Sequence, residues 1–394
     1  MKAMGYLFAG LLLMSVSSFA ASPEATYAKN GLVTSRSTLA SAVGVEIMRN
    51  GGNAVDGAVA TAFALAVTYP SAGNIGGGGF AVVRLPDGEV ITQDHRERAP
   101  GTAHKDMFLD ENGDVIPGLS TASHKAAGVP GSVDGLLALL ERYGTMKRQQ
   151  ILAPSIRLAE EGFALTHDLA RQFERRLPSM AKYPASVAVF SKNGEPYAAG
   201  DIWRQPDLAR TLKRISKSGR DGFYAGKTAD LIVAEMERGG GDISAQDLKD
   251  YESVWREPIR GTYRGYEIYG MGPPSSGGVL IQQMLNMLEP YDLGVLGWGN
   301  SETVHLMIEA ERRAYADRAE YLGDPDYYEV PIKQLTDKQY ASSRFADFNK
   351  DKATPSEKVG AGSWGPESME TTHFSVYKDG MMVALTTTLN SGYG

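Results

Sequence analysis

The chain has 394 residues, which is long enough for one large globular unit or two ordinary domains. Its composition, with 42% hydrophobic and 22% charged residues, argues against intrinsic disorder. It has no cysteine, which excludes a disulfide scaffold, a thiolate metal site and a cysteine nucleophile, so covalent catalysis would require Ser, Thr, Lys or a carboxylate. The formal net charge of −7 argues against a nucleic-acid partner. The six histidines show no metal-binding spacing, so no metal site is predicted.

The first twenty residues have the pattern of a signal peptide. Lys2 is their only charge, the apolar run Tyr6–Val16 follows it, and Ser18-Phe19-Ala20 offers small residues where a signal peptidase cleaves. We therefore expect residues 1–20 to be removed and the protein to be periplasmic or secreted, with no membrane span after signal cleavage. The alternative is an uncleaved N-terminal anchor, although the run is short for a membrane span, which needs about 20 residues.

The next part of the chain predicts two helices and a hairpin. Apolar spacing predicts a helix over Ser37–Arg49 and a buried one over Ala54–Val67. The strands Phe80–Leu85 and Glu89–Asp94 then flank a Pro-Asp-Gly turn. The glycine run Gly76–Gly79 fits neither phosphate-binding pattern, so close backbone packing is favoured over a phosphate cradle.

The middle of the chain is predicted to be mostly helical. Helical periodicity covers Val133–Tyr143, Arg148–Glu161, Asp207–Lys217, Thr228–Arg238, Val279–Leu288 and Glu302–Tyr321. Arg260–Tyr269 alternates like a strand, and the basic pair Arg312-Arg313 has acidic neighbours that indicate a solvated helix face. The segment Asn349–Glu370 is rich in Lys, Ser, Gly and Pro, which indicates a loose, mobile stretch.

A second hairpin, Thr371–Tyr377 with Met382–Thr388, follows that stretch. A threonine hydroxyl becomes a useful nucleophile when the threonine is N-terminal, because its own α-amine, with a pKa of about 7.7–8.0, accepts the hydroxyl proton. Cleavage between Glu370 and Thr371 would produce that state. On this pattern alone, a strand that begins with two threonines remains the ordinary alternative.

Five motifs follow one another along the chain: Ala72-Gly-Asn-Ile-Gly-Gly-Gly-Gly-Phe80, Asp94-His-Arg-Glu-Arg-Ala-Pro100, Gly272-Pro-Pro-Ser-Ser-Gly-Gly278, Ala314-Tyr-Ala-Asp-Arg-Ala-Glu-Tyr-Leu-Gly-Asp-Pro325 and Thr371-Thr-His-Phe-Ser375. In this order they resemble the γ-glutamyltranspeptidases, or glutathione hydrolases, of the N-terminal-nucleophile superfamily. The resemblance extends over almost the whole chain after the signal. Each motif is weak by itself, and their shared order makes the match specific.

The resemblance implies roles for individual residues. Thr371 matches the residue that attacks the carbonyl of Glu370, splits the precursor, and then serves as the nucleophile that forms a γ-glutamyl ester. Thr388 matches a threonine that hydrogen-bonds this nucleophile, and Asn390 a residue that contacts the α-groups of the substrate. Arg96 matches the arginine that binds the α-carboxylate, which suits a planar guanidinium. Without the motif, Arg96 would be interpreted as a strand residue in a surface ion pair, and Thr388 as an ordinary β-branched strand residue.

Several other polar residues are interpreted as structural. Arg98 is expected on the same strand face as Arg96, in a surface ion pair. Ser275 and Ser276 are assigned to loop structure, because the substrate-binding serine pair of the family belongs to a later motif. His373 is also interpreted as structural, because the α-amine of Thr371 would supply the base. The polar helix end is assigned the same role; it comprises Tyr315, Asp317, Arg318 and Asp324.

The resemblance also implies the fold and the partners. The expected fold is α+β, a four-layer αββα sandwich, with 21–370 as the large subunit and 371–394 as the start of a small subunit, the two forming a heterodimer after processing. The expected substrates are glutathione and other γ-glutamyl compounds, the acceptors are water, amino acids or dipeptides, and no cofactor is implied. In the family the small subunit continues further and carries an acidic α-amino ligand, a serine pair and a Gly-Gly oxyanion hole. We therefore expect a C-terminally truncated chain that is inactive alone, since one oxyanion donor contributes about 100–1000-fold in rate.

Two alternative functions remain open at this point. One is a related acylase acting on glutaryl or other acyl β-lactams, although Arg96 and Asn390 favour γ-glutamyl, because a glutaryl group lacks the full set of α-amino acid groups. The other is a non-catalytic exported remnant that keeps the fold for binding.

Overall fold

A six-stranded antiparallel sheet forms the centre of the computed structural model, which describes residues 25–359, 371–390, 392 and 393. Its strand order is β1-β9-β10-β2-β3-β6. These strands are β1 (Gly31–Thr34), β2 (Gly78–Arg84), β3 (Val90–Asp94), β6 (Val254–Arg256), β9 (Thr371–Lys378) and β10 (Met381–Thr388). The C-terminal hairpin β9–β10 therefore lies inside the sheet, between strands from the first hundred residues.

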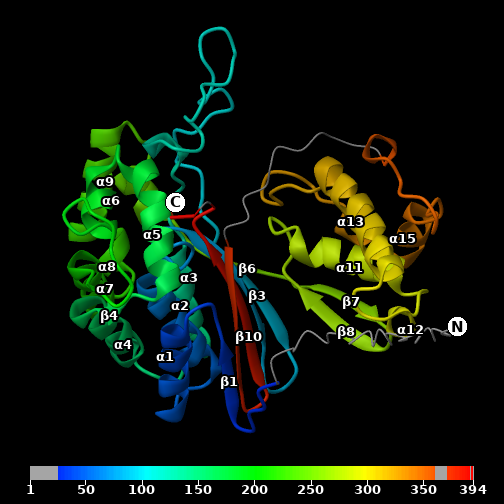
Figure 1. Cartoon of the computed structure of the whole chain (residues 1–394), viewed down its shortest axis with the longest axis horizontal. Helices are drawn as coiled ribbons and strands as arrows, with labels where there is room; N and C mark the ends of the chain where they lie inside the picture. Colours follow the sequence, from blue (N-terminus) through cyan, green and yellow to red (C-terminus); the bar gives the residue numbers. More distant parts are fainter. Residues whose placement is uncertain (1–24, 360–370, 391, 394) are drawn as a thin grey trace, which may run out of the picture.

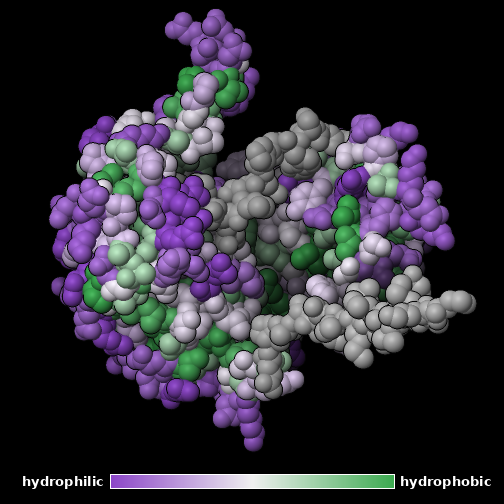
Figure 2. Space-filling model, in the orientation of Figure 1, coloured by the Kyte–Doolittle hydropathy of each residue, from purple (hydrophilic) through white to green (hydrophobic). Residues whose placement is uncertain are grey.

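Helices cover one face of this sheet (Figure 1). They are α1 (Thr38–Arg49), α2 (Ala54–Thr68), α3 (Ser132–Tyr143), α4 (Arg148–Glu161), α5 (His167–Met180), α6 (Pro184–Phe190), α7 (Pro206–Ser218), α8 (Asp221–Tyr224), α9 (Gly226–Gly239) and α10 (Ala245–Asp250). The short strands β4 (Phe163–Ala164) and β5 (Ile202–Trp203) pair among them. The outer surface of these helices is largely hydrophilic (Figure 2), as expected for helices that bury one face.

A smaller unit lies on the other side of the sheet (Figure 1). It contains the hairpin β7 (Ile259–Tyr263) with β8 (Tyr266–Gly270), and the helices α11 (Gly277–Leu288), α12 (Leu293–Leu296), α13 (Ser301–Tyr321), α14 (Ile332–Leu335) and α15 (Lys338–Arg344). Two short 3-10 turns, η1 (His124–Ala126) and η2 (Ser356–Lys358), complete the described elements. The fold is therefore α+β, with helices on one face of the six-stranded sheet and the smaller unit on its other side.

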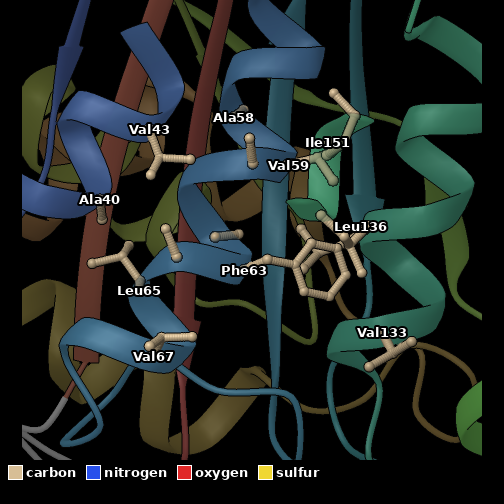
Figure 3. Close-up of a cluster of buried hydrophobic side chains, with 14 of the residues drawn as sticks. Ala40, Val43, Ala58, Val59, Phe63, Leu65, Val67, Val133, Leu136 and Ile151 are labelled. Atoms are coloured by element: carbon tan, nitrogen blue, oxygen red, sulfur yellow. The ribbon is translucent and has the colours of Figure 1, made fainter. Parts of the chain in front are cut away.

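Helix α2 is the centre of the main core. All fifteen of its residues are buried, and it begins with a capping box in which Asn53 and Asp56 bond each other's backbone N–H. Phe63 and Leu65 pack among residues of α1, α3 and α4, including Val43, Leu136 and Ile151 (Figure 3). The Ala- and Val-rich sequence of α2 is what allows neighbouring elements to approach it on all sides.

Most elements with strong periodicity are where the sequence predicts them. The bounds of α4 agree with the prediction, and the other predicted helices agree to within two residues at each end. Arg260–Tyr269, predicted as one strand, is instead the tight hairpin β7–β8. The reason is the turn Arg264-Gly265, in which both residues have positive φ angles of 49° and 85°.

Arg313 does not belong to a solvated helix face, as the sequence indicated. Its side chain and that of Glu309 are each only 1% exposed, and its Nη1 donates to Glu309 Oε2 at 2.7 Å. Its Nη2 donates to Asp347 Oδ1 at 2.7 Å, and the backbone N–H of Thr354 donates to Glu309 Oε1 at 2.9 Å. Burial alone would raise the pKa of Glu309, but hydrogen bonds from Arg313 and Thr354 outweigh it and lower that pKa to about 2.

These contacts also correct the prediction of a loose stretch over Asn349–Glu370. Thr354 is fixed to α13 by Glu309 and Arg312, and Ser356–Lys358 forms η2. Residues 360–370 lie outside the described residues, as do residues 1–24, which include the predicted signal peptide. Among the helices that the structure does describe, none combines the length and the apolar character needed to cross a membrane.

We predict that Arg313→Met lowers the free energy of unfolding by about 3–5 kcal/mol, because it leaves the Glu309 carboxylate buried without its main partner. Urea unfolding followed by circular dichroism measures the loss. The double variant Glu309→Leu with Arg313→Met is expected to be more stable than the single variant, because no unpaired charge remains. The control is Arg210→Met, which breaks an exposed pair with Asp207 and should cost less than about 1 kcal/mol. Equal losses for Arg313→Met and Arg210→Met would contradict the prediction.

Candidate active site

The two threonines singled out in the sequence face each other at one end of the sheet. Thr371 is the first residue of β9 and Thr388 the last of β10, and the strand register pairs them directly. This agrees with the expected hairpin geometry. The structure describes the backbone of Thr371 but not its side chain, and Glu370 lies outside the described residues, so their predicted roles stay predictions.

Asn74 fixes the end of β10 by hydrogen bonds. It is 6% exposed, and its Nδ2 donates to the carbonyl oxygen of Thr388 and to Thr387 Oγ1, both at 2.9 Å. Its Oδ1 accepts hydrogen bonds from Ser132 Oγ and from the N–H of Gly77. The amide is therefore satisfied on both sides, which fixes its orientation and the position of Thr388.

The glycine run allows the close packing that the sequence predicts. A Cβ on Gly77 would lie 2.2 Å from the carbonyl oxygen of Thr388, and one on Gly79 would lie 2.2 Å from the carbonyl oxygen of Thr386. No side chain larger than hydrogen fits at either position. The start of β2 can therefore lie directly against β10, beneath the paired threonines.

Arg96 and Asn390 are brought together although they are distant in the sequence. Arg96 Nη2 donates to Asn390 Oδ1 at 3.2 Å, and the guanidinium carbon lies 5.8 Å from the centroid of the Phe80 ring. Asn390 has a φ of 69°, and its N–H donates to Thr388 Oγ1 at 2.9 Å. This left-handed conformation, which asparagine tolerates, turns the chain back toward Thr388.

An acidic neighbour balances the charge of Arg96. Arg96 Nε lies 3.2 Å from Glu97 Oε2. Burial raises the pKa of Glu97 above its usual value, which weakens its preference for the charged form, and the Arg96 cation opposes this shift. Arg96 is half-buried, so a planar carboxylate can reach its remaining donors.

These residues open into a cavity of about 630 Å³, which is within the range of small-molecule sites. It is lined by Phe80, Asp94, Arg96, Glu97, Arg98, Tyr251, Glu252, Val254, Arg256, Pro274, Ser275, Ser276, Arg318, Asp324, Asp326, Thr388 and Asn390. The cavity is strongly polar and contains charges of both signs, which suits a zwitterionic ligand better than an apolar one.

Arg256 joins the two sides of this cavity. Its Nε donates to Asp94 Oδ2 at 2.8 Å, and its two terminal nitrogens donate to the carboxylate of Asp326 at 3.0 and 2.9 Å. Asp94 in turn accepts the backbone N–H of Arg96 at 2.9 Å. The ion pairs thus connect the loop after α13 to the end of β3, directly before Arg96.

Besides Arg98, four residues that line the cavity were assigned structural roles from the sequence. Ser275, Ser276, Arg318 and Asp324 all line the cavity, at the start of α11 and the end of α13. The sequence could have indicated that these four residues belong to the site, because each lies in a motif that carries the family resemblance. Asp317, by contrast, is structural as expected, because it accepts hydrogen bonds from Gln283, Tyr340 and Arg344.

Arg98 differs from its prediction. No ion pair of Arg98 is found among the described residues; its guanidinium carbon instead lies 5.4 Å from the centroid of the Tyr251 ring. The ring of His373 is held by Thr386 Oγ1 at 2.9 Å and Ser375 Oγ at 3.3 Å, and partial burial lowers its pKa. In the part of the chain that is described, no group of His, Asp or Glu is arranged to hold a metal ion.

His95 is a buried titratable residue directly before Arg96. It is 1% exposed, its backbone pairs with Gly79 in both directions, and its Nδ1 has no hydrogen-bond partner. Burial, together with the neighbouring Arg96 cation, lowers the pKa of His95 to about 3. The imidazole is therefore neutral at physiological pH and acts as packing beneath the cavity.

Comparisons with known proteins agree on one family. The family model described as Gamma-glutamyltranspeptidase matches residues 40–394. "Glutathione hydrolase proenzyme" from Escherichia coli (strain K12) is 47% identical over 373 residues, which cover 93% of this chain and 64% of that protein. This chain thus spans slightly less than two thirds of the length of that relative.

Two solved structures are also similar. The crystal structure of Helicobacter pylori γ-glutamyltranspeptidase has a TM-score of 0.84 and 46% identity, and the match covers 86% of this chain and 97% of that one. The crystal structure of a cephalosporin acylase from Bacillus halodurans also has a TM-score of 0.84, with 28% identity, and the match covers 99% of this chain and 70% of that one.

We predict that His95 makes stability depend on pH between about 3 and 6.5. Its pKa is lowered in the folded state, so the unfolded chain binds the extra proton and stability falls as the pH drops through this range, by up to about 1.4 kcal/mol per pH unit. Urea midpoints from pH 4 to pH 7 should show a shallower slope for His95→Asn than for the wild type. The control His167→Asn, at an exposed position, should keep the wild-type slope. An unchanged slope in His95→Asn would refute the assignment.

Proposed function

The chain belongs to the γ-glutamyltranspeptidase family, and we propose on that premise that the whole protein transfers γ-glutamyl groups from glutathione and related compounds to water, amino acids or short peptides. The observation that carries the proposal is the pairing of Thr371 with Thr388 beside the cavity that contains Arg96 and Asn390. The strand register and the order of the motifs both support this arrangement.

The proposed reaction begins with processing of the precursor. The hydroxyl of Thr371 attacks the carbonyl carbon of Glu370, the peptide C–N bond breaks, and an ester forms that water then hydrolyses. The products are a large chain ending at Glu370 and a chain that begins with the free amine of Thr371. The similar protein from E. coli is named a proenzyme, which supports such a step.

Turnover then uses the new N-terminus. The free α-amine of Thr371 accepts the hydroxyl proton while the oxygen attacks the γ-carbonyl carbon, and that proton passes to the leaving amine as the amide C–N bond breaks. Water or an acceptor amine next attacks the γ-glutamyl ester, the ester C–O bond breaks, and the hydroxyl of Thr371 regains its proton. No cofactor takes part in these steps.

The cavity provides groups that match the γ-glutamyl end. The guanidinium of Arg96 would bind the α-carboxylate bidentately. Asn390 Oδ1, which now accepts from Arg96, would accept from the α-ammonium. The γ-carbonyl carbon would then lie toward Thr388, the last residue of β10, which pairs with Thr371 at the start of β9.

The remaining parts of the proposal concern the whole protein. We propose a four-layer αββα sandwich, a heterodimer of the two processed chains, and a location outside the cytoplasm. The arrangement of the six-stranded sheet, the β7–β8 hairpin and the helices on either side supports the first of these.

The first prediction of this proposal concerns Thr371. In the whole protein, Thr371→Ala should give a single unprocessed chain by intact mass and lower γ-glutamyl p-nitroanilide hydrolysis at least about 10⁴-fold, as loss of a nucleophile does elsewhere. Thr371→Ser is the matched control, because it keeps the hydroxyl, and it should retain processing. A Thr371→Ala protein that still splits after Glu370 and turns over substrate would refute the mechanism. If the wild type also shows neither activity but binds a γ-glutamyl ligand, the non-catalytic alternative is correct.

The acylase alternative is supported by the similarity in fold to the Bacillus halodurans cephalosporin acylase and by the 40% identity to the Acylase ACY 1 proenzyme of Pseudomonas sp. (strain V22). Glutaryl and γ-glutamyl groups share the carboxylate that Arg96 would bind, so the difference between them is the α-amino group. A site that hydrogen-bonds a substrate nitrogen rejects an analogue that lacks it, in some enzymes by 10⁴–10⁵-fold. The Arg96–Asn390 pair therefore favours the γ-glutamyl group.

We predict that the wild type hydrolyses γ-glutamyl p-nitroanilide at least about 100-fold more efficiently than glutaryl p-nitroanilide, in kcat/KM. Asn390→Ala should narrow this ratio, because it removes an acceptor for the ammonium. Arg96→Lys should lower both values about equally, because both substrates lose the bidentate contact. A wild-type preference for the glutaryl substrate would favour the acylase function instead.

A further inference from the structure

A second cavity lies on the other side of β9 from β10. It has a volume of about 470 Å³, is open to solvent, and is lined by Thr34, Ser35, Arg36, Tyr69, Thr372 and His373. Strand β1 pairs with β9 so that Thr34 lies opposite Ser375, and the chain then continues as Ser35 and Arg36 alongside the first residues of β9. The second cavity therefore adjoins the residues that directly follow Thr371.

The two cavities lie on opposite sides of Thr371, the proposed nucleophile. In the sheet order β1-β9-β10-β2-β3, the second cavity belongs to β1 and β9, whereas Arg96 follows β3 on the opposite side. A γ-glutamyl group bound at Arg96 would place its carbonyl near Thr371. The group on the far side of that carbonyl would then extend toward β1.

The chemistry of the second cavity is that of an anion site. Arg36 is exposed and makes no hydrogen bond or ion pair with any described residue, in contrast to Arg96, Arg256 and Arg313. No acidic side chain lines the cavity, and the other polar groups are hydroxyls and one imidazole. Partial burial lowers the pKa of His373, so Arg36 is the fixed positive charge there.

The cavity also has firm walls. The His373 ring is held between Thr386 Oγ1 and Ser375 Oγ. Ser35 Oγ donates to the carbonyl oxygen of Ser37, at the start of α1, and shares a hydrogen bond of 2.7 Å with Ser41 Oγ. The backbone that carries Arg36 is therefore held on both sides, so that a bound ligand has to order the Arg36 side chain but not the segment that carries it.

We propose that Arg36 binds the carboxylate of the peptide or amino acid that leaves from, or accepts, the γ-glutamyl group. The inference rests on the proposed function and assigns a second carboxylate site to the same reaction. Cysteinylglycine leaving glutathione and an acceptor dipeptide both end in a carboxylate, and a cavity of this size holds a dipeptide. Arg96 would thus recognise one end of the substrate and Arg36 the other.

The test compares two acceptors that differ only in the terminal charge, glycylglycine and glycylglycinamide, with γ-glutamyl p-nitroanilide as donor in the whole protein. Arg36→Ala should raise the KM for glycylglycine about tenfold, because a charge-assisted contact is lost. It should leave the KM for glycylglycinamide, and hydrolysis without acceptor, within twofold of the wild type. Arg36→Lys, which keeps the charge, should give an intermediate KM for glycylglycine.

The matched control is Arg49→Ala, which removes the same charge from an exposed position at the far end of α1 and should change neither KM. An unchanged KM for glycylglycine in Arg36→Ala, or equal increases for both acceptors, would overturn the proposal while the wild type still transfers normally. A wild type that releases no p-nitroaniline would instead contradict the proposed function, and the role of Arg36 with it.

Discussion

The contact between the glycine run and the end of β10 is the constraint on which the candidate site depends. Gly77 and Gly79 lie so close to the carbonyl oxygens of β10 that a Cβ has no room. Asn74, just before them, bonds the carbonyl oxygen of Thr388 and so fixes the strand end along its own axis. Within the sheet, β9 pairs with β10 so that Thr371 lies opposite Thr388, and the position of Thr371 therefore depends on the same contact.

Charge is distributed unevenly around this fixed strand end. The chain is acidic overall, yet four arginines line the cavity, and two of them, Arg96 and Arg256, form ion pairs with neighbouring carboxylates. Arg256 is shared by Asp94 and Asp326, which leaves it few donors for a ligand. Among the described residues, the polar partners of the Arg96 guanidinium are Glu97 and Asn390, and the raised pKa of Glu97 makes its carboxyl a weaker competitor of a substrate carboxylate for Arg96. The proposed binding arginine, Arg96, and the bridging arginine, Arg256, thus lie in one cavity.

Local pattern was sufficient for much of the fold and for part of the site. Periodicity located helices such as α4, and the hairpin register that pairs Thr371 with Thr388 follows from turn position alone. The burial of Arg313 could not be predicted, because the partners that neutralise it, Asp347 and Thr354, come from a segment more than thirty residues away. The ion pair between Arg256 and Asp326 was not predicted for the same reason, because these two residues are seventy positions apart in the chain. The sequence thus predicted the residues that lie at a strand end or within a motif. It did not predict the ion pairs between residues that are far apart in the chain.

The sheet order also gives the proposed substrate a direction. A γ-glutamyl peptide is charged at both ends and reacts in the middle, so two cationic subsites on opposite sides of one nucleophile match its shape. Arg96 and Arg36 follow the ends of different strands, β3 and β1, and the hairpin β9–β10 lies between them. The same insertion of the C-terminal hairpin into the middle of the sheet that fixes Thr371 therefore also separates the two arginines. Strand order thus places the two arginines of the proposed substrate site on opposite sides of Thr371.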